Sequence, residues 1–176
     1  VEAWSTIIKK VHDNGSNIFI QFWALGRQAF PGNLKRDGLR YISASDDTYI
    51  DYPRQEIAIT ANNHQHGLTK DEIKSFVDDF VNATRNSIKA GADGVEIHSA
   101  YGYFLNQFLD PASNKRTDEY GGSIENRSRI VLEVLDACIE AVGSEKVGLR
   151  LSPWARYAGM SGSNDPTLLA TFSYII

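Results

Sequence analysis

Apolar positions along the chain follow two periods, that of a helix and that of a strand. Near the start they recur every three or four residues up to Asn14-Gly15, which predicts a helix that stops there. In residues 17–23 (NIFIQFW) they alternate in the manner of a strand. The two faces of that strand would hold Ile18, Ile20 and Phe22 on one side, and Phe19, Gln21 and Trp23 on the other. Polar Gln21 therefore lies near the carboxyl end of a predicted strand.

The order of helix and then strand occurs a second time. Thr69 and Glu72 have the spacing of a capping box, so a helix is expected to begin at Thr69. A strand is predicted at residues 94–98, and its alternation places Glu96 and His98 on the same face. This strand also has a polar residue, His98, at its carboxyl end.

A third unit repeats the order once more. Ser123 is the predicted cap of a helix that Gly143 closes, and residues 147–151 (VGLRL) predict the next strand, with Arg150 near its end. Asp165-Pro166 predicts the start of a further helix, because proline is favoured at the first helical position. Strands that alternate with helices predict an α/β fold with a parallel sheet and right-handed crossovers.

Two connections are long, residues 24–68 and 99–122, and neither shows an obvious secondary structure pattern. Both follow the carboxyl ends of predicted strands, where β/α barrels and open α/β sheets build their active sites. Long connections inside a compact domain are usually functional. The sequence therefore predicts that the functional site lies where these segments leave the sheet.

Two architectures fit this order, a doubly wound sheet and part of an eight-stranded barrel. The doubly wound dinucleotide fold should show G-x-G-x-x-G after its first strand, but WALGRQAFPG stands there. Polar side chains at strand ends, here Gln21, His98 and Arg150, are typical of the top of a (β/α)8 barrel. A complete barrel takes roughly 200 residues or more. The 176 residues of this chain predict an incomplete one.

The composition bears on which partners the protein can bind and on where in the cell it is expected. The net charge of -4 supplies no basic stripe for nucleic acid, and no apolar run reaches the roughly 18 residues of a membrane span. Cys138 is the single cysteine and no signal peptide is evident, so a cytoplasmic protein is expected. His64 and His66 have a spacing that two metal ligands could use, but no third ligand is in view and no metal is expected.

Several long motifs carry a resemblance to a known family. They are IQFWALGRQAFPGNLKRDGLRY, ADGVEIHSAYGYFLNQFLDP, SNKRTDEYGGSIENRSR and KVGLRLSP. In this order, and over nearly the whole chain, they resemble the Old Yellow Enzyme family, especially its fungal NADPH dehydrogenases. The resemblance implies that residues 1–176 are part of a single FMN-binding β/α barrel domain, its central portion. It also implies that NADPH reduces the flavin, which passes hydride to the C=C bond of a small α,β-unsaturated carbonyl compound, and that the complete enzyme can be a homodimer.

The resemblance also implies roles for particular residues. Gln21 and Arg150 match positions that hydrogen-bond the flavin's pyrimidine edge, where a guanidinium would stabilise the negative charge of the reduced ring. His98 matches the donor to the substrate's carbonyl oxygen, and Tyr103 matches the tyrosine that protonates the carbon next to that carbonyl. Two further residues match or fall near positions that shape the substrate pocket, Trp23 and Tyr157.

Tyr101 departs from the family pattern, which has asparagine or histidine at this place as a second donor to the substrate's oxygen. A tyrosine hydroxyl can still donate, but its reach differs and its ring can take up space in the pocket. Loss of one such donor would slow the reaction by about 10²- to 10³-fold. Tyr101 is therefore predicted to bind substrate, in a way that differs from its relatives.

Other features have structural explanations. Arg150 could be a surface ion-pair partner, but Leu149 and Leu151 flank it and favour burial, and a buried arginine needs an anion beside it. Phe104 and Phe108 are expected to pack a loop onto the barrel, and Cys138 to act as a small apolar residue of a helix face. A charge network is expected to order the second long connection through Arg116, Asp118, Glu119, Arg127 and Arg129.

The apolar end at Ile175-Ile176 and the start at Val1 predict a chain that is cut at both ends. Phosphate-binding barrels usually hold phosphate with loops after strands seven and eight, which this chain does not supply. A second hypothesis is thus a truncated, inactive remnant that cannot hold FMN alone and associates with another chain to cover its unpaired strands. A third, an open α/β domain for another nucleotide, would need a phosphate loop that the sequence does not show.

Overall fold

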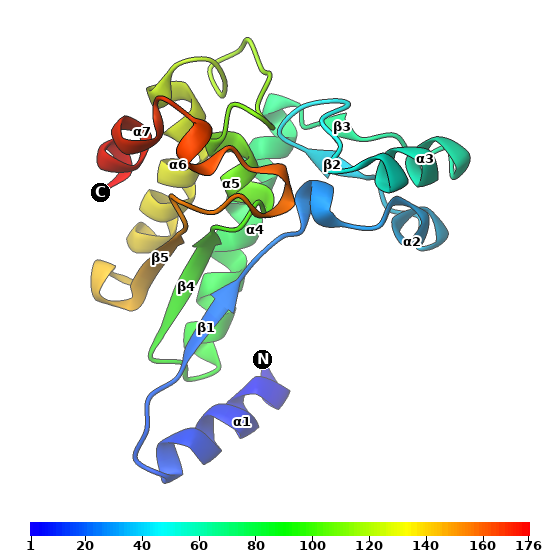
Figure 1. The fold of residues 1–176 in the computed structure, drawn as a ribbon. Helices are drawn as coiled ribbons and strands as arrows, with labels where there is room; N and C mark the ends of the chain where they lie inside the picture. The colour runs from blue at the N-terminus through cyan, green and yellow to red at the C-terminus, as the bar shows by residue number, and fades with distance from the viewer.

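The computed structural model describes all residues 1–176 and centres on a parallel sheet with the strand order β1-β4-β5 (Figure 1). A second, two-stranded parallel sheet pairs β2 with β3. The helices and strands are α1 (Glu2–Asp13), β1 (Phe19–Phe22), α2 (Pro31–Arg36), β2 (Ile42–Ser43), α3 (Tyr52–Thr60), β3 (His66–Gly67), α4 (Lys70–Lys89), β4 (Gly94–Ser99), α5 (Phe104–Leu109), α6 (Ile124–Val142), β5 (Val147–Leu151) and α7 (Leu168–Ile175).

The predicted ends of the long helices are confirmed. Thr69 caps α4, and both halves of its capping box with Glu72 are present. The Ser123 hydroxyl accepts a hydrogen bond of 3.3 Å from the backbone N–H of Asn126 at the start of α6. Gly143 follows α6 with a φ of 94°, which favours glycine. Local capping chemistry thus sets where these two helices begin and end.

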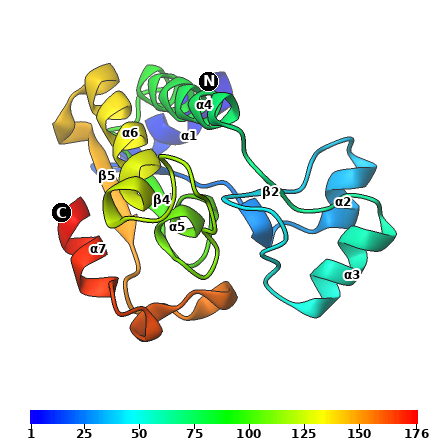
Figure 2. The ribbon, with the colours of Figure 1, turned by 90° about the horizontal axis from the view of Figure 1, so that it is seen from above.

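The central sheet has one apolar face, and helices cover it. The strand alternation directs Val95 and Ile97 of β4 to this face, where both are fully buried. They belong to a core cluster that includes Phe80 of α4 and Val134 of α6. Figure 2 shows α4 and α6 side by side along this side of the sheet. Both crossover helices therefore pack on the same face, which is the layering of a barrel segment.

The opposite face of the sheet is open. Phe19 is 53% exposed and Trp23 is 52% exposed, and both lie on the face predicted for them. The register sets Gln21 beside Glu96 and His98 beside Arg150 on this same face. We refer to this surface, made of Gln21, Glu96, His98 and Arg150 with Trp23 at its edge, as the inner face.

Residues 24–68, which show no obvious secondary structure pattern in the sequence, do contain helices and strands. This segment forms a lobe with α2, α3 and the β2–β3 sheet, which extends from the main body in Figures 1 and 2. The local signals are present in the sequence. Pro31 begins α2, and the Asp51 carboxylate caps α3 by accepting a 2.8 Å hydrogen bond from the Arg54 N–H. The helices are short, so no long apolar period reveals them.

Two further boundaries differ from the prediction. Residues 99–122 contain the short helix α5, and the last helix, α7, begins at Leu168 rather than at Pro166. The Asp165 carboxylate accepts hydrogen bonds from the N–H of Thr167 at 2.8 Å and from its hydroxyl at 2.7 Å, so it stabilises a turn before the helix. None of the helices is both long and apolar enough to cross a membrane.

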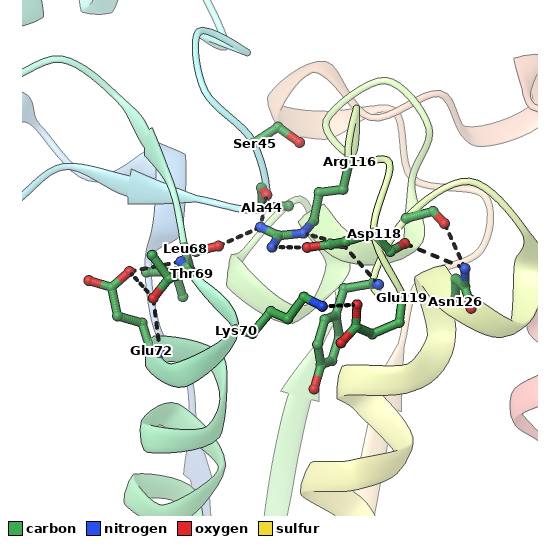
Figure 3. A network of polar contacts seen from close by, with 12 residues as sticks. Ala44, Ser45, Leu68, Thr69, Lys70, Glu72, Arg116, Asp118, Glu119 and Asn126 are labelled. Carbon is green, nitrogen blue, oxygen red and sulfur yellow. Dashed lines mark hydrogen bonds and ion pairs between the residues drawn. The ribbon is translucent and has the colours of Figure 1, made fainter.

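A charge network joins the lobe to the connection between α5 and α6 (Figure 3). Arg116 donates to the carbonyl oxygens of Ala44 at 2.9 Å and of Leu68 at 2.6 Å. The same guanidinium donates to both carboxylate oxygens of Asp118, at 2.9 and 2.6 Å, and this pairing lowers the pKa of Asp118. Lys70 pairs with Glu119 at 2.6 Å. The expected network is confirmed at Arg116, Asp118 and Glu119, and also at Arg129, which donates to the Glu119 carbonyl at 2.7 Å.

Arg127 contacts the second long connection as expected, but at the Leu109 carbonyl and not at the carboxylates of Asp118 and Glu119. Its guanidinium is buried and donates to the Leu109 carbonyl at 2.5 Å and to the Thr167 hydroxyl at 2.9 Å. It thus connects α6 with the end of α5 and with the turn before α7. Cys138 is fully buried on α6 as predicted, and its Sγ accepts a hydrogen bond from the Thr84 hydroxyl.

Candidate functional site

Three strands bring polar side chains together on the inner face. The Gln21 side-chain amide donates a hydrogen bond to the Glu96 carboxylate, and Arg150 Nη1 lies 3.7 Å from the same carboxylate oxygen. His98 is paired with Arg150 in the register between β4 and β5. Gln21, His98 and Arg150 therefore point to the same side of the sheet at neighbouring positions, as the strand alternation predicted.

Aromatic residues stand at the carboxyl end of this face. The rings of Trp23 and Tyr103 meet edge to face with centroids 4.5 Å apart, and Tyr103 meets His98 in the same way at 5.2 Å. Tyr101 lies 6.2 Å from His98, and the Arg150 guanidinium lies 5.7 Å from the centre of the Tyr101 ring. Trp23, His98, Tyr101 and Tyr103 thus form one cluster, and the Arg150 side chain joins it to the polar row.

A tight turn after β4 presents the two tyrosines. Tyr101 has a φ of 52° and Gly102 a φ of 74°, so both lie in the left-handed region that a bulky residue rarely adopts. Tyr101 is held there from both sides, because its N–H donates to the Ser152 hydroxyl at 2.7 Å and its carbonyl accepts from the Gln28 amide at 2.8 Å. A Cβ at Gly102 would lie 2.8 Å from the Ala158 Cβ, so this position requires glycine.

Two side chains of α5 hold the turn at residues 101–102 by hydrogen bonds to the Gly102 backbone. The Asn106 side chain accepts from the Gly102 N–H at 2.8 Å, and the Gln107 amide donates to the Gly102 carbonyl at 2.8 Å. Phe104 and Phe108 are buried in the core, which confirms their predicted packing role. Sequence reasoning missed Asn106 and Gln107 as supports of the turn. The signal was their position as a polar pair inside the apolar stretch FLNQFL.

His98 is held as a hydrogen-bond donor. Burial, and then the positive charge of Arg150, lower the pKa of the His98 imidazole below its usual value. A hydrogen bond with the backbone of His98 itself and the negative charge of Glu96 oppose this shift. The imidazole is therefore neutral at neutral pH. Its Nδ1 accepts from the Ala100 N–H at 3.3 Å, so the ring proton resides on Nε2. A neutral imidazole with a protonated Nε2 can donate one hydrogen bond to an oxygen atom at this face.

The expectation that Arg150 is buried is wrong for this structure. Its side chain is 46% exposed on the open inner face, and the leucines that flank it in sequence point to the opposite, helix-covered side. Alternation in the strand explains the difference, because neighbours in sequence face opposite sides of a sheet. The anion expected beside Arg150 is the Glu96 carboxylate.

Tyr157 is not brought into the aromatic cluster. Its side chain is 62% exposed, and no ring contact joins it to Trp23, Tyr101 or Tyr103. Its backbone does approach the turn, since a Cβ at Gly102 would lie 3.2 Å from the Tyr157 carbonyl oxygen. Its place in the substrate pocket stays a prediction.

A cavity of about 460 Å³ lies away from this site, between α4 and the lobe. It is lined mainly by apolar side chains, such as Leu34, Leu39 and Phe76. Three charged residues lie at its wall: Arg40 and Glu72 are paired with each other, and Asp79 is the third. The donors and acceptors that could orient a reacting molecule are on the inner face instead.

The donors of the inner face suit the edge of a flavin. A pyrimidine edge presents acceptors that alternate with one N–H donor. Gln21 keeps one N–H and its carbonyl oxygen free of protein partners, and Arg150 has a single protein partner for its several donors. The inner face therefore has both the amide and the cation that such an edge and its reduced, anionic form would need.

Comparison with known proteins gives a consistent result. The sequence profile described as "NADH:flavin oxidoreductase / NADH oxidase family" matches residues 1–176. Enoate reductase 1 of Kluyveromyces lactis is 60% identical over 98% of this chain and 44% of its own length. A probable NADPH dehydrogenase of Candida albicans is 47% identical over 90% of this chain and 39% of its own. The chain spans less than half the length of these curated relatives.

Solved structures support the fold. The crystal structure of Old Yellow Enzyme from Pichia sp. AKU4542 superposes with a TM-score of 0.96 at 46% identity, over 99% of this chain and 45% of that one. The predicted fold class, an incomplete β/α barrel, is thereby confirmed.

Proposed function

This chain belongs to the NADH:flavin oxidoreductase / NADH oxidase family, and from this premise we propose that residues 1–176 are part of a single FMN-binding barrel domain of an NADPH-dependent ene-reductase. Bound FMN would supply the hydride-transfer chemistry between NADPH and the C=C bond of an α,β-unsaturated carbonyl compound. The observation that carries the proposal is the convergence of Gln21, His98 and Arg150 on one open face, with Trp23 and Tyr103 beside them.

In this proposal Gln21 and Arg150 hold the pyrimidine edge of the flavin. The free N–H and carbonyl groups of Gln21 match a donor and an acceptor of that edge. Arg150 supplies a permanent positive charge, which favours the negatively charged reduced ring over the neutral oxidised one. Its partial exposure on the inner face leaves donors available for this contact.

His98 and Tyr103 would act on the substrate. Neutral His98 donates from Nε2 to the carbonyl oxygen, so it stabilises the negative charge that grows there as the double bond is attacked. Tyr103 then gives its hydroxyl proton to the carbon next to that carbonyl, because a phenol keeps its proton at neutral pH yet can release it to a carbanion-like centre. The edge contact of Tyr103 with Trp23 and His98 keeps the phenol beside the imidazole.

Three aromatic residues would shape the substrate pocket: Trp23, Tyr101 and Tyr157. The name of the Kluyveromyces lactis relative, an enoate reductase, supports an activated alkene as the substrate class. The name of the Candida albicans relative supports NADPH as the reductant.

The test is a flavin titration followed by two half-reactions. FMN is added to the purified protein and the excess removed, and the flavin absorbance is followed without oxygen as NADPH is added. We expect retained yellow colour, bleaching by NADPH, and recovery of the colour on addition of 2-cyclohexenone. NADH in place of NADPH tests the choice of nicotinamide. A protein that retains no flavin would favour the hypothesis of an inactive remnant.

A further inference from the structure

Glu96 is the one carboxylate on the inner face, and the roles described so far do not use it. It lies in the middle of β4, beside Gln21 in the register and two residues before His98. One oxygen of this carboxylate, Oε1, accepts the Gln21 hydrogen bond and lies 3.7 Å from Arg150 Nη1. A single oxygen atom thus connects the two residues that would hold the flavin edge.

The neighbouring strand leaves room for this arrangement. Gly148 of β5 is the register partner of Glu96, so no side chain stands beside the carboxylate on that side. Arg150 extends from two residues further along β5 and reaches back toward Glu96. The sequence G-x-R on β5, with glutamate opposite the glycine, therefore brings cation and anion together across the strand pair.

The contact also sets the orientation of the Gln21 amide. A carboxylate only accepts hydrogen bonds, so the group that faces Glu96 has to be the Gln21 NH₂. The Gln21 carbonyl oxygen and the second N–H are then directed to other partners. Without Glu96 the amide could rotate, and its donor and acceptor would exchange places.

We propose that Glu96 is a positioning residue that orients the Gln21 amide and restrains the Arg150 guanidinium for the flavin's pyrimidine edge, and that its negative charge moderates the positive charge of Arg150 there. The identity of the ligand, a flavin, rests on the proposed function. The contacts of Glu96 with Gln21 and Arg150 do not, because they involve only residues of this chain.

The charges around His98 provide a reporter that needs no flavin. The titratable and charged groups that face this imidazole are Glu96, Arg150, Tyr101 and Tyr103. Arg150 lowers the pKa of His98 and Glu96 raises it. Removal of the Glu96 charge should therefore lower the midpoint of the His98 titration further.

The first experiment is an NMR comparison of the wild-type protein with Glu96→Gln, Glu96→Ala and the control Glu140→Gln. Glu140 is an exposed residue of α6, so the control removes an equal charge far from the inner face. We expect a lower His98 titration midpoint in both Glu96 variants. We also expect the Gln21 side-chain amide signals to approach those of a free amide in Glu96→Ala alone, because a glutamine at position 96 can still accept the hydrogen bond.

The second experiment measures FMN binding by quenching of flavin fluorescence, and the reduction potential of the bound flavin. We expect Glu96→Ala to raise the Kd about tenfold, on the scale of one lost hydrogen bond. Glu96→Gln should keep the Kd within about twofold and shift the potential to a more positive value, because Arg150 is then no longer balanced and favours the reduced anion.

The two experiments distinguish failure of the proposed function from failure of the positioning role of Glu96. If the wild-type protein binds no FMN, the proposed function fails, and the NMR comparison still decides whether Glu96 positions Gln21. If both Glu96 variants match Glu140→Gln in the His98 titration and in the Gln21 signals, the positioning role is overturned. An equal weakening of FMN binding in Glu96→Gln and Glu96→Ala would also overturn it, because the glutamine side chain can still accept the hydrogen bond from the Gln21 NH₂ and an alanine cannot.

Discussion

The two faces of the central sheet are built from alternate residues of the same strands and have opposite properties. On one face Val95 and Ile97 are fully buried under α4 and α6. On the other, Gln21, Glu96 and Arg150 remain accessible and contact one another. Neighbouring residues of β4 therefore alternate between the core and the candidate site.

The covered face therefore contributes mainly to the stability of the fold, and the open face carries the residues proposed for the chemistry. Burial of apolar side chains is the main contribution to the stability of the fold, and it is concentrated on the helix-covered face. A half-exposed ion pair such as Arg150 with Glu96 contributes little to the stability. Substitutions on the two faces should therefore affect different measurements.

The largest effect is expected from Ile97→Ala on the covered face. Ile97 has no exposed surface, so the substitution loses the buried side chain and leaves a cavity, at a cost of about 3 kcal/mol in the free energy of unfolding. Urea denaturation measures it. The matched substitution Gln21→Ala on the inner face should change the same quantity by less than about 1 kcal/mol. Equal losses at both positions would contradict the division between the faces.

Substitutions in the aromatic cluster at the carboxyl end of the inner face should affect catalysis rather than stability. Tyr103→Phe removes the proposed proton donor and should slow alkene reduction about 100-fold, while reduction of the flavin by NADPH is largely preserved. Stopped-flow absorbance resolves the two half-reactions. Tyr174→Phe on α7 removes a half-exposed tyrosine hydroxyl elsewhere and serves as the control. Equal slowing of both half-reactions would refute the role of Tyr103.

The lobe provides a third region, where polar contacts rather than apolar burial hold the parts together. Arg116→Met removes donors to Ala44, Leu68 and Asp118, and should cost about 2 kcal/mol, the scale for hydrogen bonds of a charged group. Hydrogen exchange should show the loss first at β2 and β3. Arg36→Met, at an exposed arginine whose ion pair is with its neighbour Asp37, should leave the exchange unchanged.

The smallest effect is expected at Tyr101. Asparagine tolerates the left-handed backbone better than tyrosine, which should gain about 1 kcal/mol, whereas loss of the Arg150 contact should cost about 0.5 kcal/mol. Tyr101→Asn is thus expected to raise the thermal midpoint slightly. A lowered midpoint would indicate that the ring contributes more through Arg150 than its backbone strain costs. Tyr101→Phe, which keeps ring and backbone, isolates the hydroxyl.

The parts of the structure that the sequence predicted are those governed by local periods and caps. The ends of α4 and α6, the span of β5, and the common face of Gln21, His98 and Arg150 all follow from such patterns. The lobe did not, because its helices are too short for a clear period and its sheet has two residues in each strand. The role of Glu96 required the register between strands, which no single strand reveals.

We propose that the open face of the sheet, and not the cavity between α4 and the lobe, receives the flavin. The most direct measurement is an NMR titration of the isotope-labelled protein with FMN, in which the perturbed signals are mapped onto the structure. We predict that the side-chain signals of Gln21, His98 and Arg150 shift together while those of Val95 and Ile97 stay in place. Perturbations confined to the cavity beside Leu34 and Leu39, or none at any position, would contradict the claim.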